Sequence, residues 1–320
     1  MQDGVCNQYQ AVIQRPSEYV PDFGCPICQN SEHRELLGNP PIRSCVHCGH
    51  AFRQHNHGKL IPDYSGKVKM PFRIEARYYA RFHYDLIEQQ VGFTNVKNLL
   101  EIGSGDGELL KLLYRKNPEL GLFSIEASRD LCEGLRKIPN VHVINTYVEK
   151  VNLEQRFELV LLFSVLEHLP DPVKILRLIH DKFLEPGGHL VLKVPTREFE
   201  LFSQAMARMA PAGHLHFFDG IGLGRLLASI GFDAETISGI KYRTIPAKYI
   251  AVMEELSRIN ERRMGGQAKR LYLKAVRRLS TYLKITALYA IKRTPPKIPF
   301  QEINHRFNNL VIVARKEKSA

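Results

Sequence analysis

Two stretches of this chain have residue types and spacings that could do chemistry, and the first is rich in glycine. It reads Glu101-Ile-Gly-Ser-Gly-Asp-Gly107 and stands between an apolar run and a leucine-rich segment. That order predicts a buried strand, a tight loop and a helix, with glycines that let the backbone approach a ligand. A dinucleotide site would have glycine or alanine where this chain has Glu108. Because Asp106 and Glu108 would repel a pyrophosphate at the helix start, we expect a ligand other than a phosphate.

The second stretch contains two C-x-x-C motifs, Cys25-Pro-Ile-Cys28 and Cys45-Val-His-Cys48, with sixteen residues between them. This spacing is typical of a four-cysteine zinc ribbon, and Gly49 can supply the positive φ that such a turn often needs. Four thiolates close the coordination shell, so the expected zinc is structural and does not activate water. A ribbon that has lost its metal, or a redox pair, are the alternatives. Four histidines would then lie outside the metal shell: His47, His50, His55 and His57.

Acidic residues stand where the first two predicted strands end. Glu101 ends the strand before the glycine loop and could accept a hydrogen bond from a cationic amino group. Glu126 follows a second strand at 122–125, and its carboxylate could hold both hydroxyls of a ribose. Strand and helix patterns then alternate, which predicts a mostly parallel sheet with helices on both faces. Further strands are predicted at 141–144, 157–162, 184–194, 232–240 and 307–314.

Together these motifs resemble the cofactor site of class I S-adenosylmethionine-dependent methyltransferases. The stretch Phe163-Ser-Val-Leu-Glu-His-Leu-Pro-Asp-Pro172 resembles the loop after that family's fourth strand, and 184–194 resembles its fifth strand. The resemblance implies an α/β, Rossmann-like fold with a seven-stranded, mostly parallel sheet whose last strand is antiparallel. It also implies that S-adenosylmethionine is bound by Glu101, Gly103, Ser104, Gly105, Gly107, Glu126, Ala127, Thr146, Phe163 and Ser164.

Histidines are the candidate bases for this chemistry. Methyl transfer to a hydroxyl requires removal of its proton, for which the pKa of histidine is suitable. His214 and His216 share a side of an extended segment that resembles a histidine-bearing stretch of small-molecule and glycan methyltransferases. We place these two ahead of His168, for which a structural or cofactor-side role is an equal alternative. All three are expected in loops at the carboxyl edge of the sheet, where such folds bind ligands.

The chain divides into a zinc-ribbon module at 1–58, a linker at 59–73 and a methyltransferase domain at 74–320. Within that domain, an insertion at 247–294 carries twelve Lys or Arg and three acidic residues, so it holds +9 of the +12 formal charge. Two basic helices are predicted there. They could pack on the domain with a solvated face, contact anionic lipid or a lipid-linked substrate, or bind nucleic acid.

The acceptor is the least determined part of the prediction. The first hypothesis is a sugar hydroxyl on a glycan, a lipid-linked glycan or a related natural product, with a histidine as general base. The alternatives are an RNA methyltransferase that uses the ribbon and the basic helices, and a non-catalytic S-adenosylmethionine-binding scaffold. The sequence shows neither a signal-peptide pattern nor a long uncharged apolar run. We therefore expect a cytoplasmic protein, with peripheral contact to an anionic membrane through 247–294.

Overall fold

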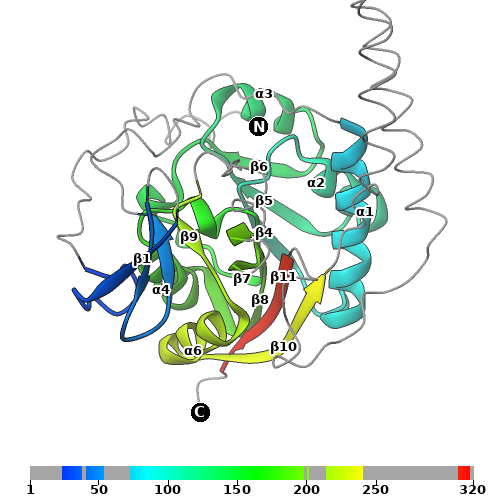
Figure 1. Cartoon of the computed structure of the whole chain (residues 1–320). Helices are drawn as coiled ribbons and strands as arrows, with labels where there is room; N and C mark the ends of the chain where they lie inside the picture. The colour runs from blue at the N-terminus through cyan, green and yellow to red at the C-terminus, as the bar shows by residue number, and fades with distance from the viewer. Residues whose placement is uncertain are drawn as a thin grey trace, which may run out of the picture.

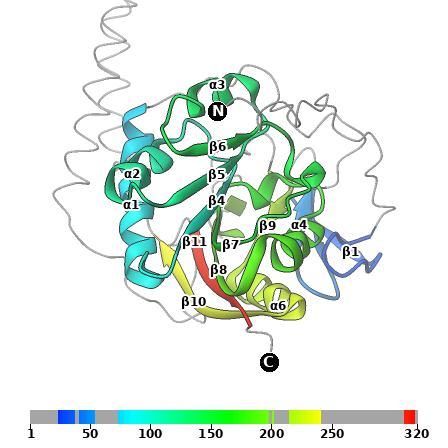
Figure 2. The same cartoon turned by 180° about the vertical axis from the view of Figure 1, so that it is seen from behind.

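The computed structural model describes residues 24–37, 41–53, 73–197, 200–201, 214–240 and 309–317. A large twisted sheet lies at the centre, with helices on both faces and a small sheet at one side (Figures 1 and 2). The strand order of the large sheet is β10-β11-β8-β7-β4-β5-β6. Its strands are β4 (Asn98–Ile102), β5 (Gly121–Ile125), β6 (Val141–Ile144), β7 (Phe157–Phe163), β8 (Leu184–Pro195), β10 (Phe232–Ile240) and β11 (Asn309–Lys316).

The pairing confirms the predicted fold class. The contacts β4–β5, β5–β6, β4–β7 and β7–β8 are parallel, whereas β11 runs antiparallel to both β8 and β10. The last strand of the chain is thus inserted between the fifth and the sixth strand of the sheet. Because parallel strands end at a common edge, the residues that follow β4, β5 and β7 are brought together there.

Helices cover both faces of the sheet because its strands are apolar on both sides. On one face lie α1 (Arg73–Gln90), α2 (Glu108–Lys116) and α3 (Arg129–Leu135), which pack on the alternate residues Leu99, Leu159 and Val191. On the other face lie α4 (Pro172–Leu178) and α6 (Gly220–Ile230), which pack on Leu100, Val160 and Leu192. α4 continues directly into a π-helical segment, Ile179–Phe183.

The small sheet joins the N-terminal part of the chain to the large domain. Its order is β1 (His33–Leu37), β2 (Ile42–Cys45), β3 (Ala51–Arg53) and β9 (His216–Phe217). All three pairings are antiparallel. We call the N-terminal part with β1, β2, β3 and the four cysteines the cysteine module. Since β9 lies between β8 and α6 in the chain, the sheet of this module is completed by a strand from the methyltransferase domain (Figure 1).

Several predicted features lie outside the described residues. They are the basic insertion 247–294, the first 23 residues, His55, His57 and the linker 59–73 apart from Arg73, which begins α1. Of the helices that the structure describes, none combines the length and the apolar character that crossing a membrane requires.

Candidate active site

The glycine loop between β4 and α2 adopts a backbone that only glycine takes readily. Gly103, Gly105 and Gly107 have φ values of 73°, 57° and 71°. A Cβ on Gly103 would lie 2.4 Å from Cγ2 of Val165, and one on Gly107 would lie 2.5 Å from Cδ2 of Leu135. Gly103 therefore allows the close approach of the loop that follows β7, while Gly107 allows the packing of α3 on this turn.

A cavity of about 320 Å³ opens at the carboxyl ends of β4, β5 and β7. Seven residues predicted to bind the cofactor line it, and so does one candidate base: Gly103, Gly105, Glu126, Ala127, Thr146, Phe163, Ser164 and His168. Tyr147, Val148 and Glu149, which the sequence analysis did not single out, line the cavity as well. Ser164 has a φ of 56°, an unusual value for a residue with a side chain, and such strain is common at ligand sites.

The remaining three predicted cofactor residues lie behind the cavity wall. Ser104 accepts a hydrogen bond from Ser124 at 2.8 Å and donates one to the Glu101 carbonyl. These two bonds attach the glycine loop to β5 and β4. Gly107 caps α2. Glu101 is 5% exposed, and among the described residues its Oε2 has no hydrogen-bond partner. Burial raises the pKa of Glu101 to about 8. A cationic group bound beside Glu101 would offset the cost of burying its ionised carboxylate. The ammonium group of a methionine moiety is such a cation.

Glu126, which was predicted to hold a ribose, is fixed at the cavity wall by backbone donors. Its Oε2 accepts the Gly105 N–H at 3.0 Å and its Oε1 accepts the Ser128 N–H at 2.9 Å. Asn145, next to Thr146, donates to the backbone carbonyl of Glu126 at 2.9 Å. Burial raises the pKa of Glu126, although the backbone N–H groups that it accepts oppose this effect. Backbone donors thus orient the carboxylate at the cavity wall and leave lone pairs for hydroxyl groups.

A second group of polar residues lies next to His168. Its centre is His214, whose Nδ1 lies 2.6 Å from Oε1 of Glu200, and the His168 ring meets the His214 ring edge-on at 4.6 Å between centroids. Burial alone would lower the pKa of His214, but the hydrogen bond and charge of Glu200 together with the charge of Glu167 raise it. A carboxylate oxygen of Glu167 and one ring nitrogen each of His168 and His214 lie within 4.8 Å of one another. The histidine predicted as a base therefore lies against a residue of the cofactor cavity.

His216 is placed differently from His214. It is 1% exposed, and its Nε2–H donates to the Leu169 carbonyl at 2.9 Å. Its Nδ1 lies 3.2 Å from Nε2 of His50, so in the neutral rings His50 donates and His216 accepts. One nitrogen of His216 is thus bonded within the large domain, and the other joins this domain to His50 of the cysteine module.

The four cysteines form one cluster at the tip of that module. The Sγ atoms of Cys25 and Cys48 are 3.5 Å apart, as are those of Cys28 and Cys45, and all four sulfurs lie within 4.8 Å of one another. Tetrahedral zinc with bonds of about 2.3 Å would place its sulfurs roughly 3.8 Å apart, so the donor set fits the metal. The turns after the knuckles have positive φ at Gln29 and Gly49, 62° and 74°, as the sequence predicted for Gly49.

Three residues near His214 escaped the sequence analysis. Glu200 comes from the segment after β8, Arg53 ends β3, and Lys193 is a buried residue of β8. Burial lowers the pKa of Lys193, whereas the neighbouring Glu167 carboxylate raises it. Lys193 could have been recognised in the sequence, because a charged residue inside the apolar run of a central strand requires a partner. No sequence feature pointed to Glu200 or Arg53.

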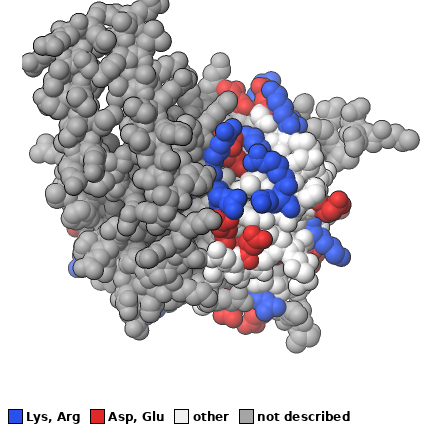
Figure 3. Space-filling model, turned by 90° about the vertical axis from the view of Figure 1, so that its right-hand side faces the viewer, with Lys and Arg blue, Asp and Glu red and all other residues white. Residues whose placement is uncertain are grey.

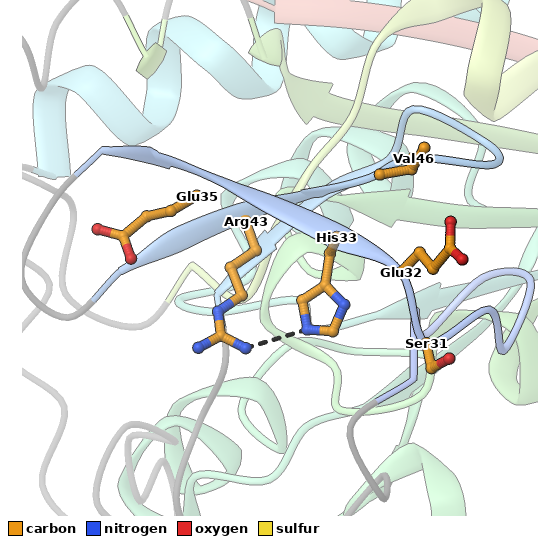
Figure 4. A pocket seen from close by; sticks show the side chains of 6 residues that line it. All are labelled: Ser31, Glu32, His33, Glu35, Arg43 and Val46. Atoms are coloured by element: carbon orange, nitrogen blue, oxygen red, sulfur yellow. Dashed lines mark hydrogen bonds between the residues drawn. The ribbon is translucent and has the colours of Figure 1, made fainter.

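Two other surface features do not resemble a catalytic site. The face of α1 and α2 shows Lys and Arg side chains gathered with acidic ones (Figure 3), where Arg77 and Lys111 both pair with Glu108. In both pairs the cation is exposed whereas Glu108 is buried, and the Arg77 pair joins α1 to α2. A hollow of about 500 Å³ on the outer side of β1 and β2 contains an Arg43–His33 hydrogen bond of 3.0 Å (Figure 4).

Comparison with known proteins agrees with this geometry. A family model described as a methyltransferase domain matches residues 73–237, more than half of the chain. The chain belongs to the methyltransferase domain family. A solved methyltransferase from a complex with the Haloferax volcanii Trm112 methyltransferase activator shares the fold, with a TM-score of 0.50 and 12% identity. That match covers 78% of this chain and 94% of the other.

Curated relatives of this methyltransferase are named ubiquinone biosynthesis O-methyltransferases. The protein of Xanthomonas euvesicatoria pv. vesicatoria (strain 85-10) is 29% identical over 164 residues, which cover 45% of this chain and 66% of that protein. The protein of Leptothrix cholodnii (strain ATCC 51168 / LMG 8142 / SP-6) is 24% identical over 185 residues, which cover 51% and 75%. This methyltransferase thus spans slightly under two thirds of the length of the Xanthomonas protein.

Proposed function

We propose that this methyltransferase transfers the methyl group to a hydroxyl oxygen of its acceptor and that His214 is the general base. The observation that carries the proposal is the 2.6 Å contact between His214 and Glu200, because a carboxylate on Nδ1 fixes the tautomer in which Nε2 can accept a proton. His168, which lines the cofactor cavity, touches the same ring. Since His216 has both nitrogens occupied in the protein interior, we assign it to structure and keep His168 as a group that orients the acceptor.

The roles of the other residues follow from their positions. S-adenosylmethionine, when bound, supplies a methyl group on a sulfonium centre. Glu126 would hold the ribose hydroxyls, Glu101 the ammonium group, and the glycine loop the close backbone contact. His214 would take the acceptor proton at Nε2 while Glu200 stabilises the imidazolium that forms. Holding the acceptor oxygen in line with the methyl group accounts for much of the rate in such reactions.

For the acceptor we propose first a sugar hydroxyl of a glycan, a lipid-linked glycan or a related natural product. An alcohol is a much weaker acid than a phenol, whose pKa is about 10, so it depends more on a buried base with a carboxylate partner. The relatives named for ubiquinone biosynthesis support O-methylation and make a phenolic hydroxyl the natural comparison. RNA methylation and cofactor binding without catalysis are the other outcomes. Methyl incorporation into panels of sugar, phenolic and RNA acceptors separates all four.

Substitution of the histidines tests the base. We expect His214→Asn to lower kcat by about 10²- to 10⁴-fold and to leave the Kd for S-adenosylhomocysteine unchanged. His142→Asn is the matched control, because His142 is exposed on β6, the strand at the far edge of the sheet. Full activity of His214→Asn would contradict the proposed base. Activity that requires added Mg²⁺ or Mn²⁺ would instead point to a metal bound by Glu167, His168 and His214, and would equally remove the role of base.

We also propose that the four cysteines hold one structural zinc ion. The support is the closeness of the four sulfurs together with the backbone N–H groups of Ile27 and Cys48, which donate to Cys25 and Cys45 at 3.5 Å. Such bonds stabilise thiolates in a closed shell. Metal analysis of protein purified without chelator should find about one zinc per chain, and Cys25→Ser should abolish it. Protein that is metal-free but fully folded would overturn this assignment.

We propose that the insertion 247–294 contacts an anionic membrane, because its formal charge of +9 lies on segments that also carry apolar stripes. We expect salt-sensitive sedimentation with phosphatidylserine vesicles that is lost when Lys274, Arg277 and Arg278 become Glu. Equal recovery with neutral vesicles would remove the proposed contact.

A further inference from the structure

The cysteine module is joined to the base by the backbone itself. In the small sheet Ala51 pairs with Phe217 and Phe52 with His216, so β3 lies directly beside β9. One residue further, the Arg53 N–H donates to the Leu215 carbonyl at 2.8 Å, and the Leu215 N–H donates to the Glu167 carbonyl at 2.8 Å. The segment that carries His214 is thus held between the module on one side and the loop after β7 on the other.

Arg53 reaches this segment with its side chain as well. The residue is 3% exposed, its guanidinium carbon lies 5.6 Å from the centre of the Phe217 ring, and its Nη1 donates to the His214 carbonyl at 3.4 Å. That last bond is long, so the guanidinium acts mainly as a buried positive charge next to the pair that His214 forms with Glu200. The sequence separation between Arg53 and His214 is 161 residues.

We propose that the four-cysteine module completes the methyl-transfer site, and that its Arg53 is a positioning residue for His214 and Glu200. The inference rests on the proposed role of His214 as the base. It means that the module is more than an appended binding domain: its third strand is part of the wall behind the base. The proposed base is therefore held in place only when the module is folded.

The charges around His214 give the proposal a specific signature. Among the described residues, the groups that act on this ring are Glu200, Glu167, His168 and Arg53, and Lys193 lies next to Glu167. The two carboxylates raise the pKa of His214 and Arg53 lowers it. Loss of the Arg53 charge should therefore raise the pKa of His214 further. Because the base is active only when it is unprotonated, the acid limb of the plot of kcat against pH should move to higher pH.

The experiment compares three variants of the full chain. Arg53→Met should lower kcat about 10- to 100-fold, since a small displacement of the base is costly, and should move the acid limb upward. Arg53→Lys keeps the charge and should restore the position of the limb. Arg43→Met is the control, because Arg43 lies in the same module on β2 and bonds to His33 on the outer side (Figure 4). In all variants the Kd for S-adenosylhomocysteine should stay within about threefold of the original value, because none of the module's residues that the structure describes lines the cofactor cavity.

The outcomes separate the inference from the proposed function. If His214→Asn is inactive while Arg53→Met keeps the original kcat and pH profile, the positioning role of Arg53 is overturned and His214 remains the proposed base. If His214→Asn keeps full activity, the base itself fails. A fall in kcat for Arg53→Met with no change in profile, matched by Arg43→Met, would mean general destabilisation and would also overturn the inference.

Discussion

The two sides of the site are built from different kinds of sequence. The cofactor side takes its residues from four short segments, 101–107, 126–127, 146–149 and 163–165, each at or just after the end of a strand of one sheet. The proposed acceptor side combines Arg53, which ends β3 of the small sheet, with Glu167, Glu200 and His214, which lie outside the strands in distant parts of the chain. The first side depends on local backbone rules, whereas the second depends on how the cysteine module packs on the domain.

The largest effect is expected on the cofactor side, from Gly103→Val. A β-branched residue cannot easily adopt a φ of 73°, and its Cβ would overlap Val165. We expect S-adenosylhomocysteine binding to weaken at least about 100-fold, so that the stabilisation of about 2.7 kcal/mol that saturating ligand gives at 100 times its Kd disappears from thermal shifts. Gly134→Ala is the control, because a Cβ there meets nothing within 4 Å. A normal thermal shift for Gly103→Val would show that this loop does not contact the cofactor.

A smaller effect on the same side is a proton linkage at Glu101. Its pKa is raised to about 8 by burial, so near pH 7 the carboxyl is mostly protonated, while an ammonium group requires the ionised form. Binding should release a proton at pH 7, and affinity should fall as pH decreases below 8, by up to about tenfold per unit. Calorimetry in two buffers of different ionisation enthalpy measures the release, and Glu101→Gln should abolish it. Proton release that persists in Glu101→Gln would assign the linkage to another group.

The smallest effect lies at His83, where the two sides meet. Its ring stacks on Phe163 of the cofactor cavity at 4.1 Å, and burial followed by the charge of Lys193 lowers its pKa well below the usual value. Since the unfolded chain binds a proton below pH 6.5 and the folded His83 does not, stability falls as pH decreases. Between pH 7.5 and 5.5 His83 should account for roughly 1.4 kcal/mol of lost unfolding free energy.

Urea unfolding at the two pH values measures this loss. His83→Phe preserves the stacking and should lose less stability than the original protein over the same interval. His142→Phe, which replaces the exposed histidine stacked on Phe123, is the matched substitution with which the His83 variant is compared. An identical pH dependence in His83→Phe and the original protein would show that folding does not lower the pKa of His83.

The sequence by itself predicted the fold and the cavity at the carboxyl edge of its sheet. Apolar runs and the resemblance to a known family placed the strands, and the predicted limits of Val141–Ile144 and Phe232–Ile240 agree with the structure. The glycine spacing and the acidic residues at 101 and 126 marked the cavity, because backbone conformation and strand ends are specified within a few residues. The cysteine spacing likewise marked a cluster that the structure brings together.

Only the tertiary structure distinguished His214 from His216, although they are two residues apart on one extended segment. His214 faces Glu200 and His168, whereas His216 is enclosed between Leu169 and His50, a residue 166 positions away in the chain. Which neighbour a side chain meets depends on the packing of β3 against β9, a contact between segments that share no local pattern. The physical reason is that hydrogen bonds and burial act through space, so the partners of a histidine are fixed by the assembled fold and not by its neighbours in the sequence.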